Sequence, residues 1–203
     1  MLNRLRGLMS RVMTPPADAL LRAGVSPDAV TIVGTLVVVV TALWAFPTGH
    51  LFVGALVIGV FVLTDSLDGV MARRSGRSGP WGAFLDSTLD RFGDGAIFAG
   101  LLLWFVGDGD DRLTAVLALA CVVLGSIVPY ARARAEGLGM TASGGIAERA
   151  DRLLIALVAT AAVGLGAPDA VLTVALGFLA VASAVTIVQR MAKVHRQAVG
   201  VTE

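Results

Sequence analysis

The sequence has few charged residues. Asp, Glu, Lys and Arg make up only 15% of its 203 residues, whereas 56% are hydrophobic and the mean hydropathy is +0.83. A soluble domain contains about 25% charged residues. This deficit argues against a soluble domain and predicts an all-α integral membrane protein. The formal net charge of +1 gives no reason to expect a nucleic acid partner.

Cysteine, histidine and lysine are scarce as well. Cys121 is the only cysteine, so no disulfide can form within the chain. The histidines are His50 and His195, and the single lysine is Lys193. Thiolate and imidazole ligands are therefore almost absent, and a metal site would have to use oxygen ligands.

The first 28 residues lack the apolar core of a secretory signal. Leucines and methionines instead recur there at helical spacing among Arg4, Arg6 and Arg11. Residues 1–28 are therefore predicted to form an amphipathic segment that lies on the membrane surface. A frayed terminal helix is the alternative.

Six uncharged runs follow, and each predicts a membrane-spanning helix. They are residues 30–46, 51–64, 95–107, 113–131, 153–168 and 170–189. A spanning helix needs roughly 20 apolar residues, so the second and third helices must continue through the neighbouring aspartates, which then lie at the membrane boundary. We predict one six-helix domain over residues 29–196, followed by a tail over residues 197–203.

The basic residues are unevenly distributed over the predicted loops. Of the sixteen Lys and Arg residues, only Arg112 lies on one side of the six-helix arrangement, and all others lie on the opposite side. The positive-inside rule then places both termini and the loops 73–82 and 132–152 in the cytoplasm. The predicted localisation is the cell membrane, with a multi-pass chain and a site that faces the cytoplasm.

Four aspartates flank the link between the second and third helices. Asp65 and Asp68 are three residues apart, and Asp86 and Asp90 are four apart, so each pair shares one face of a helix. The Gly- and Ser-rich segment 74–81 predicts a tight hairpin that brings both pairs to the same depth. Four carboxylates repel one another unless cations offset them, and they predict a site for a hard divalent ion, Mg²⁺ or Mn²⁺. The alternative is charged helix ends that are solvated or paired with arginines.

These aspartates belong to a longer motif, D-x2-D-G-x2-A-R-x8-G-x3-D-x3-D, over residues 65–90. At every fixed position the motif resembles the signature of the CDP-alcohol phosphotransferase family. The resemblance implies transfer of a phosphatidyl group from CDP-diacylglycerol to an alcohol by a homodimeric membrane enzyme. It implies that Asp65, Asp68, Asp86 and Asp90 bind two divalent ions, and that Asp90 also acts as the general base. Residues that would contact CDP-diacylglycerol are Asp65, Asp68, Gly69, Ala72, Arg73, Ser78, Gly79 and Gly82.

A weaker resemblance precedes the first predicted span. Family members carry Pro-Asn and a downstream Thr near the nucleotide, and this chain has Pro27, Asp28 and Thr31. The resemblance implies that Asp28, Ala29 and Thr31 contact CDP-diacylglycerol, although Asp28 lacks the donor amide of Asn. The alternative is a helix cap with Pro27 beside it.

Arginines at the ends of the last three predicted helices lie at the depth of the aspartates. A cationic pocket beside a metal site suits an acceptor that carries its own phosphate. This region resembles the actinobacterial phosphatidylinositol-phosphate synthases, and the resemblance implies inositol phosphate as the acceptor. The arginines that would hold its phosphate are Arg132, Arg134, Arg152 and Arg190. Positive-inside anchoring is the alternative for any one of them.

Two other functions stay open at this point. One is a phosphatidylglycerol-phosphate synthase that uses glycerol phosphate. The other is a divalent-cation transporter that uses the aspartates as a transit site, although the aspartates lie toward one side only. Asp94 continues the series four residues after Asp90, but it lies outside the motif and no chemistry is assigned to it.

Overall fold

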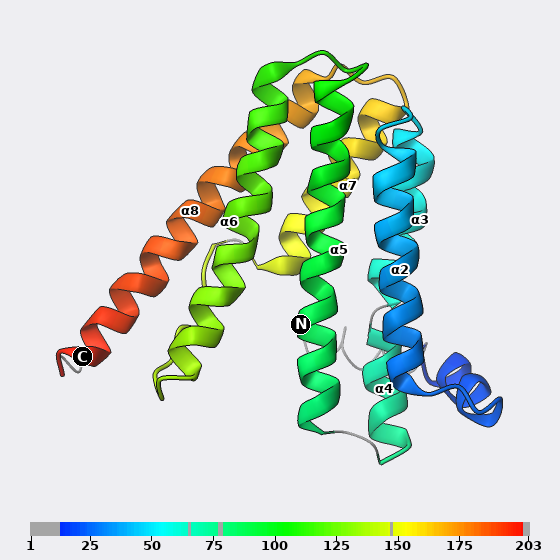
Figure 1. The fold of residues 1–203 in the computed structure, drawn as a ribbon, viewed down its shortest axis with the longest axis vertical. Coiled ribbons are helices and arrows are strands. Elements are labelled where there is room, and N and C mark those ends of the chain that lie inside the picture. Colours follow the sequence, from blue (N-terminus) through cyan, green and yellow to red (C-terminus); the bar gives the residue numbers. More distant parts are fainter. Residues whose placement is uncertain (1–12, 65, 77–78, 147, 201–203) are drawn as a thin grey trace.

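The structure, a computed structural model, describes residues 13–64, 66–76, 79–146 and 148–200. The regular secondary structure of these residues is entirely helical (Figure 1). The helices are α2 (Pro27–Ala45), α3 (Leu51–Thr64), α4 (Ser66–Arg74), α5 (Pro80–Val106), α6 (Arg112–Glu136), α7 (Arg149–Gly164) and α8 (Ala170–Ala198). The all-α class predicted from composition is confirmed.

Four helical stretches are long and apolar enough to cross a membrane. They are Pro27–Ala45, Leu51–Arg74, Arg112–Glu136 and Ala170–Ala198, within the part of the chain that the structure describes. The other two predicted spans correspond to α7, which has only 16 residues, and to α5, whose first half carries charged residues. The chain is therefore a multi-pass membrane protein.

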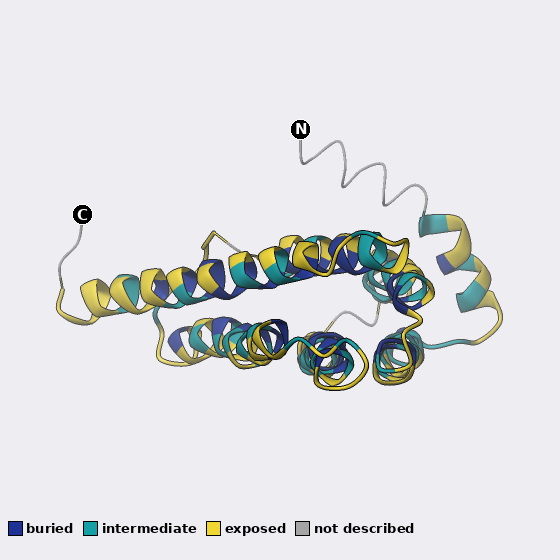
Figure 2. Cartoon of the chain, turned by 90° about the horizontal axis from the view of Figure 1, so that it is seen from above, coloured by how far each residue is buried: buried dark blue, intermediate teal, exposed yellow. Residues whose placement is uncertain are grey.

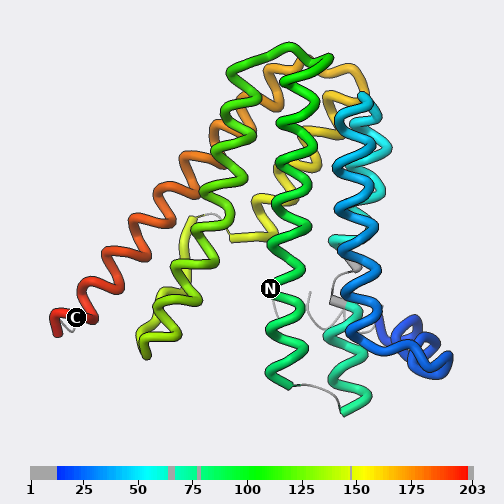
Figure 3. Tube along the Cα trace, in the orientation of Figure 1, coloured from blue at the N-terminus to red at the C-terminus, as the bar shows by residue number. Residues whose placement is uncertain are grey.

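The helices pack as a closed ring. Helix α2 contacts α3 and α5, α5 contacts α6, α6 contacts α8, and α7 joins α8 to α3. Seen from above, the helices lie in two rows (Figure 2). Helix α4 packs against α2, and the chain then turns back at the foot of the bundle into α5 (Figure 3). Helix α4 ends at Arg74 and α5 begins at Pro80, so only a short link separates the helices that carry Asp68 and Asp86.

Apolar side chains cover both the inside and the outside of the ring. Buried residues of the ring helices include Phe46, Ile58, Leu101, Phe105 and Leu172. Large apolar side chains on the outer faces, such as Trp44, Val40 and Val174, remain exposed. A helix that is apolar all round is typical of a membrane span, where lipid contacts the outer face.

Residues 13–22 form a helix ahead of α2. Ala17 on this helix is buried against Val70 and Met71 of α4, and the Nε atom of Arg74 lies 2.5 Å from Oδ1 of Asp18. This part of the predicted amphipathic segment therefore docks onto α4. Residues 1–12 lie outside the described residues.

Capping residues fix where two of the helices begin. Ser26 caps α2, since its hydroxyl accepts a hydrogen bond from the backbone N–H of Ala29 at 3.2 Å, and Pro27 follows in the first turn. Asp111 caps α6 by accepting hydrogen bonds from backbone N–H groups. The hydrogen bond from the Thr114 hydroxyl, at 2.6 Å, is the main reason why the pKa of Asp111 lies below its usual value.

Candidate active site

Asp68 is held in place by contacts from two helices. It lies in the first turn of α4. Its Oδ1 accepts a hydrogen bond from the backbone N–H of Gly69 at 2.6 Å, and its Oδ2 accepts one from the Thr31 hydroxyl of α2 at 2.5 Å. The positive end of the helix dipole also favours a carboxylate at this position. Asp68 is therefore fixed in direction, as a metal ligand requires.

Asp86 and Asp90 lie one turn apart on α5, and the structure brings both close to Asp68. Asp68 and Asp86 line a cavity of about 1110 Å³ that is enclosed by α3 to α8. Asp68 and Asp90 line a second cavity of about 480 Å³ between α2, α3, α4 and α5. Asp68 therefore shares one cavity with Asp86 and the other with Asp90, and the joint metal site of the four aspartates stays a prediction. Asp65, the fourth, lies outside the described residues.

The oxygen donors of this region fit a hard divalent ion. Within residues 13–64, 66–76, 79–146 and 148–200, no three His, Cys, Asp or Glu side chains gather closely enough to hold a metal. That search leaves out Asp65, which directly precedes α4. The donors present, Asp68 and Asp86, are carboxylates that line the same cavity, and carboxylates suit Mg²⁺ or Mn²⁺ better than zinc.

The residues predicted to contact the nucleotide lie around the same two cavities. Ala29 and Thr31 line the smaller cavity, and Gly69 and Arg73 line the larger one. The Thr31 hydroxyl donates a hydrogen bond to Asp68 in this structure.

Other members of the predicted nucleotide set lie further from the cavities. The Asp28 carboxylate accepts a hydrogen bond from Nε1 of Trp81 at 3.0 Å. Ala72 is half-buried, and Gly79 is exposed. A Cβ on Gly82 would meet no atom within 4 Å, which leaves room for a ligand. Ser78 lies outside the described residues.

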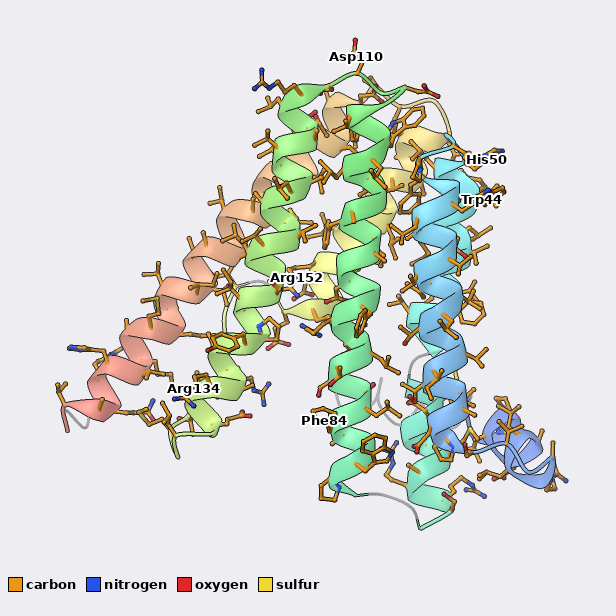
Figure 4. The ribbon with its side chains drawn as sticks, viewed as in Figure 1. Trp44, His50, Phe84, Asp110, Arg134 and Arg152 are labelled. Carbon is orange, nitrogen blue, oxygen red and sulfur yellow. The ribbon has the colours of Figure 1, made fainter. Side chains whose placement is uncertain are left out.

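Arginines line the larger cavity together with Asp68 and Asp86, and those from α6, α7 and α8 are called the arginine wall below. Of the four predicted acceptor-binding arginines, Arg132, Arg152 and Arg190 line this cavity. Arg134 is exposed and is not among the lining residues. Figure 4 shows Arg152 in the middle of the bundle and Arg134 near the lower end of α6.

The three lining arginines differ in what they contact. The Nε of Arg190 donates to the backbone carbonyl of Gly144 at 3.2 Å, and its Nη1 donates to that of Val128. Arg132 pairs with Glu136 one turn away, at 2.8 Å, and both side chains are about half exposed. Arg152 is only 3% exposed. Arg190 thus ties the loop before α7 to the bundle, whereas Arg152 lies inside it.

Sequence reasoning missed two residues that join the acidic and basic walls. Arg149 reaches Asp90 with Nη2, at 2.8 Å from Oδ1, and Asp94 with Nε, at 3.0 Å from Oδ1. Among the described residues, Arg149 and Asp68 are the charged side chains that line both cavities. The available signal was spacing, because Asp94 follows Asp90 by four residues and Arg149 precedes Arg152 by three, which puts each pair on one helix face.

Comparisons with known proteins agree with this arrangement. Residues 24–145 match the family model for CDP-alcohol phosphatidyltransferase. The phosphatidylinositol phosphate synthase of Cutibacterium acnes is 49% identical over 97% of this chain and 98% of its own. The enzyme of the same name from Streptomyces avermitilis is 47% identical over 97% of this chain and 84% of its own.

Solved structures show the same fold. The Mycobacterium tuberculosis phosphatidylinositol phosphate synthase with CDP-DAG bound superposes with a TM-score of 0.88 at 45% identity, over 91% of this chain and 94% of that one. The same enzyme in complex with manganese and citrate gives a TM-score of 0.87 at 44% identity, over 90% of this chain and 88% of that one. The chain belongs to the CDP-alcohol phosphatidyltransferase family.

Proposed function

We propose that this protein transfers the phosphatidyl group of CDP-diacylglycerol to a hydroxyl of inositol phosphate, which releases CMP and forms phosphatidylinositol phosphate. One observation carries the proposal: Asp68 and Asp86 line the same cavity as Arg149, Arg152 and Arg190. Carboxylates that bind metal serve the diphosphate of the donor, and fixed guanidinium groups serve the phosphate of the acceptor. The relatives named phosphatidylinositol phosphate synthase align over nearly the whole chain.

The apolar part of the larger cavity suits the lipid portion of the donor. It is lined by apolar residues of α3 and α7: Phe52, Leu56, Val60, Leu154 and Val158. Acyl chains entering there would keep contact with apolar surface while the diphosphate stays beside Asp68. The smaller cavity, lined by Ala29 and Thr31, would take part of the CDP group.

Asp65, Asp68, Asp86 and Asp90 are the proposed ligands of two divalent ions, Mg²⁺ with Mn²⁺ as an alternative. A relative solved with manganese supports a divalent metal in this family. When bound, such ions would offset the charge of the diphosphate and of the departing CMP. The protein's own contribution is to fix these carboxylates, as Thr31 and the Gly69 backbone do for Asp68.

The proposed reaction is an in-line displacement at the phosphorus that carries diacylglycerol. The acceptor oxygen forms a bond to this phosphorus, and the bond between the phosphorus and the bridging oxygen breaks, so that CMP leaves with the electron pair. Asp90 takes the proton of the attacking hydroxyl. Arg132, Arg134, Arg152 and Arg190 are the proposed partners of the acceptor's phosphate, and Arg152 is the one most deeply buried beside the aspartates.

The acceptor is tested by measuring CMP release from CDP-diacylglycerol by purified protein with Mg²⁺. Inositol phosphate, glycerol phosphate, inositol and serine are supplied in parallel. Release with inositol phosphate alone is expected: inositol and serine lack a phosphate to offset the charge of the arginines, and the relatives are named for inositol phosphate rather than glycerol phosphate. Release with glycerol phosphate instead would overturn the proposed acceptor and keep the phosphatidyltransferase activity. No release with any acceptor would contradict both.

We also propose the full membrane arrangement: six spanning helices over residues 29–196, both termini in the cytoplasm, and a site facing the cytoplasm of the cell membrane. It is supported by the end of the bundle where Asp110 lies, opposite the end where Arg134 lies (Figure 4): the connections 46–51, 107–112 and 164–170 carry Arg112 as their one Lys or Arg residue. In whole cells, a Cys introduced at Asp110 should react with a membrane-impermeant maleimide, and one introduced at Arg134 should not. The reverse labelling would contradict this orientation. A homodimer is proposed from the family alone, and a monomeric mass after cross-linking in native membranes would oppose it.

A further inference from the structure

Asp94 is a buried carboxylate at which three arginines converge. It lies on α5 outside the family motif and is 6% exposed. Its Oδ1 accepts a hydrogen bond from Nε of Arg149 at 3.0 Å. Its Oδ2 lies 3.6 Å from Nη2 of Arg152 and 3.7 Å from Nη2 of Arg91. Arg149 and Arg152 come from α7, so Asp94 links the acidic helix to the arginine wall.

The three arginines around Asp94 are largely buried. Arg152 is 3% exposed, and the side chains of Arg91 and Arg149 are 30% and 28% exposed. Guanidinium groups this close repel one another, and each is costly to bury without an anion. Asp94 supplies negative charge to all three, whereas Asp90 pairs with Arg149 and Arg91. Removal of the Asp94 charge would take away the carboxylate that the Arg152 guanidinium faces.

Arg152 keeps unused donors inside the bundle. Its Nε and Nη1 are buried and have no hydrogen-bond partner among the described residues, while Nη2 faces Asp94. Buried donors without partners are rare in folded proteins. Arg152 lines the larger cavity beside Arg149. Donors held in this way match the oxygens of a phosphate group, which a guanidinium fork binds in a fixed direction.

We propose that Asp94 is a positioning residue for the acceptor: it holds Arg149 and Arg152 in the directions in which they receive the acceptor's phosphate. The inference rests on the proposed function, because it presumes an acceptor that carries a phosphate. Asp94 also lines the smaller cavity, but its two carboxylate oxygens face the guanidinium groups of Arg149 and Arg152. It acts through the two guanidinium groups, and its loss changes how the acceptor binds and leaves the donor site nearly unchanged.

A purely structural role of Asp94 would give a different kinetic result when the residue is substituted. If it served only to neutralise the bundle interior, its substitution would lower stability and reduce the active fraction, and both substrates would be affected alike. A positioning role would raise the KM for inositol phosphate and leave the KM for CDP-diacylglycerol nearly unchanged. The contacts support this separation, since the carboxylate of Asp94 faces arginines, whereas that of Asp68 is held by Thr31 and the Gly69 backbone.

The test compares Asp94→Asn with wild type in CMP release at saturating Mg²⁺, with inositol phosphate and CDP-diacylglycerol varied in turn. We expect the KM for inositol phosphate to rise by about 10- to 100-fold, the range seen when groups that orient metal ligands are removed. The KM for CDP-diacylglycerol should change by less than about threefold. Asp151→Asn is the matched control, since Asp151 is exposed on the same end of α7 and lines neither cavity. Its KM values should match those of wild type.

A double-mutant cycle with Arg152→Ala tests the route of the effect. If Asp94 acts through Arg152, the Asp94→Asn change should raise the acceptor KM less in the Arg152→Ala background than in wild type. Full additivity would overturn that route. If Asp94→Asn does not fold, Asp94→Glu keeps the charge and displaces the carboxylate, and a raised acceptor KM with an unchanged donor KM is again expected.

The outcomes distinguish this inference from the proposed function. A wild-type protein that uses inositol phosphate, together with an Asp94→Asn variant of unchanged acceptor KM, overturns only the role of Asp94. Equal rises in both KM values, or a fall in kcat alone, overturn it as well. A wild-type protein that releases no CMP with inositol phosphate contradicts the proposed function and the inference together.

Discussion

Replacing Asp90 by Asn is expected to reduce CMP release by about 10³-fold, within the 10²–10⁴-fold range typical of a positioned general base. The amide cannot take the proton of the attacking hydroxyl. Its oxygen can still accept a hydrogen bond from Arg149, which lies 2.8 Å from Oδ1 of Asp90, so the packing of α5 should survive. The measurement is the initial rate of CMP release with donor, acceptor and Mg²⁺ all saturating.

Two controls separate this role of Asp90 from others. Asp108→Asn makes the same change at an exposed position just after α5 and should leave the rate unchanged. CDP-diacylglycerol should still raise the melting temperature of Asp90→Asn, since the other aspartates remain. If Asp90→Asn needed more Mg²⁺ than wild type but reached the wild-type rate once saturated, Asp90 would act as a metal ligand only, and its assignment as base would be wrong.

The aspartate site could be predicted from the sequence because its geometry is local. Asp86 and Asp90 lie on one face of α5 wherever that helix packs, and the short link between Arg74 and Pro80 returns the chain beside α4. The structure accordingly places Asp68 with Asp86 on one cavity and with Asp90 on the other. The helical spacing of the aspartates and the short link between the two helices were sufficient for this prediction.

The arginine wall could be predicted only in part, because its contacts depend on the whole ring. Arg149 and Arg152 of α7 pair with Asp94 of α5, which lies 55 and 58 residues earlier in the sequence. Helix α7 itself packs chiefly against α3 and α8. No local pattern tells which arginine turns inward. Arg152 turns inward, whereas Arg134, which also lies at the end of a predicted helix, is exposed at the end of α6.

Backbone contacts are a second reason for the difference. Arg190 was predicted from its place at the end of a helix, yet two of its nitrogen atoms bond to the carbonyls of Gly144 and Val128. Likewise, Asp28 was predicted from a motif and accepts a hydrogen bond from Trp81. A sequence shows which side chains are available and does not show which backbone groups a fold leaves without partners.

Replacing Gly100 by Ala is expected to destabilise the folded protein by about 1–3 kcal/mol, the usual cost of overpacking a tight contact. Gly100 lies on α5 where this helix crosses α2. A Cβ at this position would overlap the backbone carbonyl of Ala42 and come within 3.1 Å of Cδ2 of Phe46. Small residues allow membrane helices to approach this closely, and a backbone carbonyl in a helix cannot move aside as a side chain can. The measurement is the apparent melting temperature in detergent, with the fraction of monodisperse protein.

Gly125→Ala is the matched control for Gly100→Ala, and it should have the opposite sign. Gly125 is a buried helical glycine on α6, and a Cβ there would meet no atom of another element within 4 Å. Ala in a helix interior is favoured over Gly by roughly 0.5–1 kcal/mol through backbone entropy, so this variant should be as stable as wild type or more so. Equal melting temperatures for the two variants would mean that α2 and α5 are not in close contact at Gly100. Because Gly100 and Asp90 share α5, a loss of stability at Gly100 with CMP release intact would also show that the aspartate end of the helix tolerates a shift at the α2 crossing.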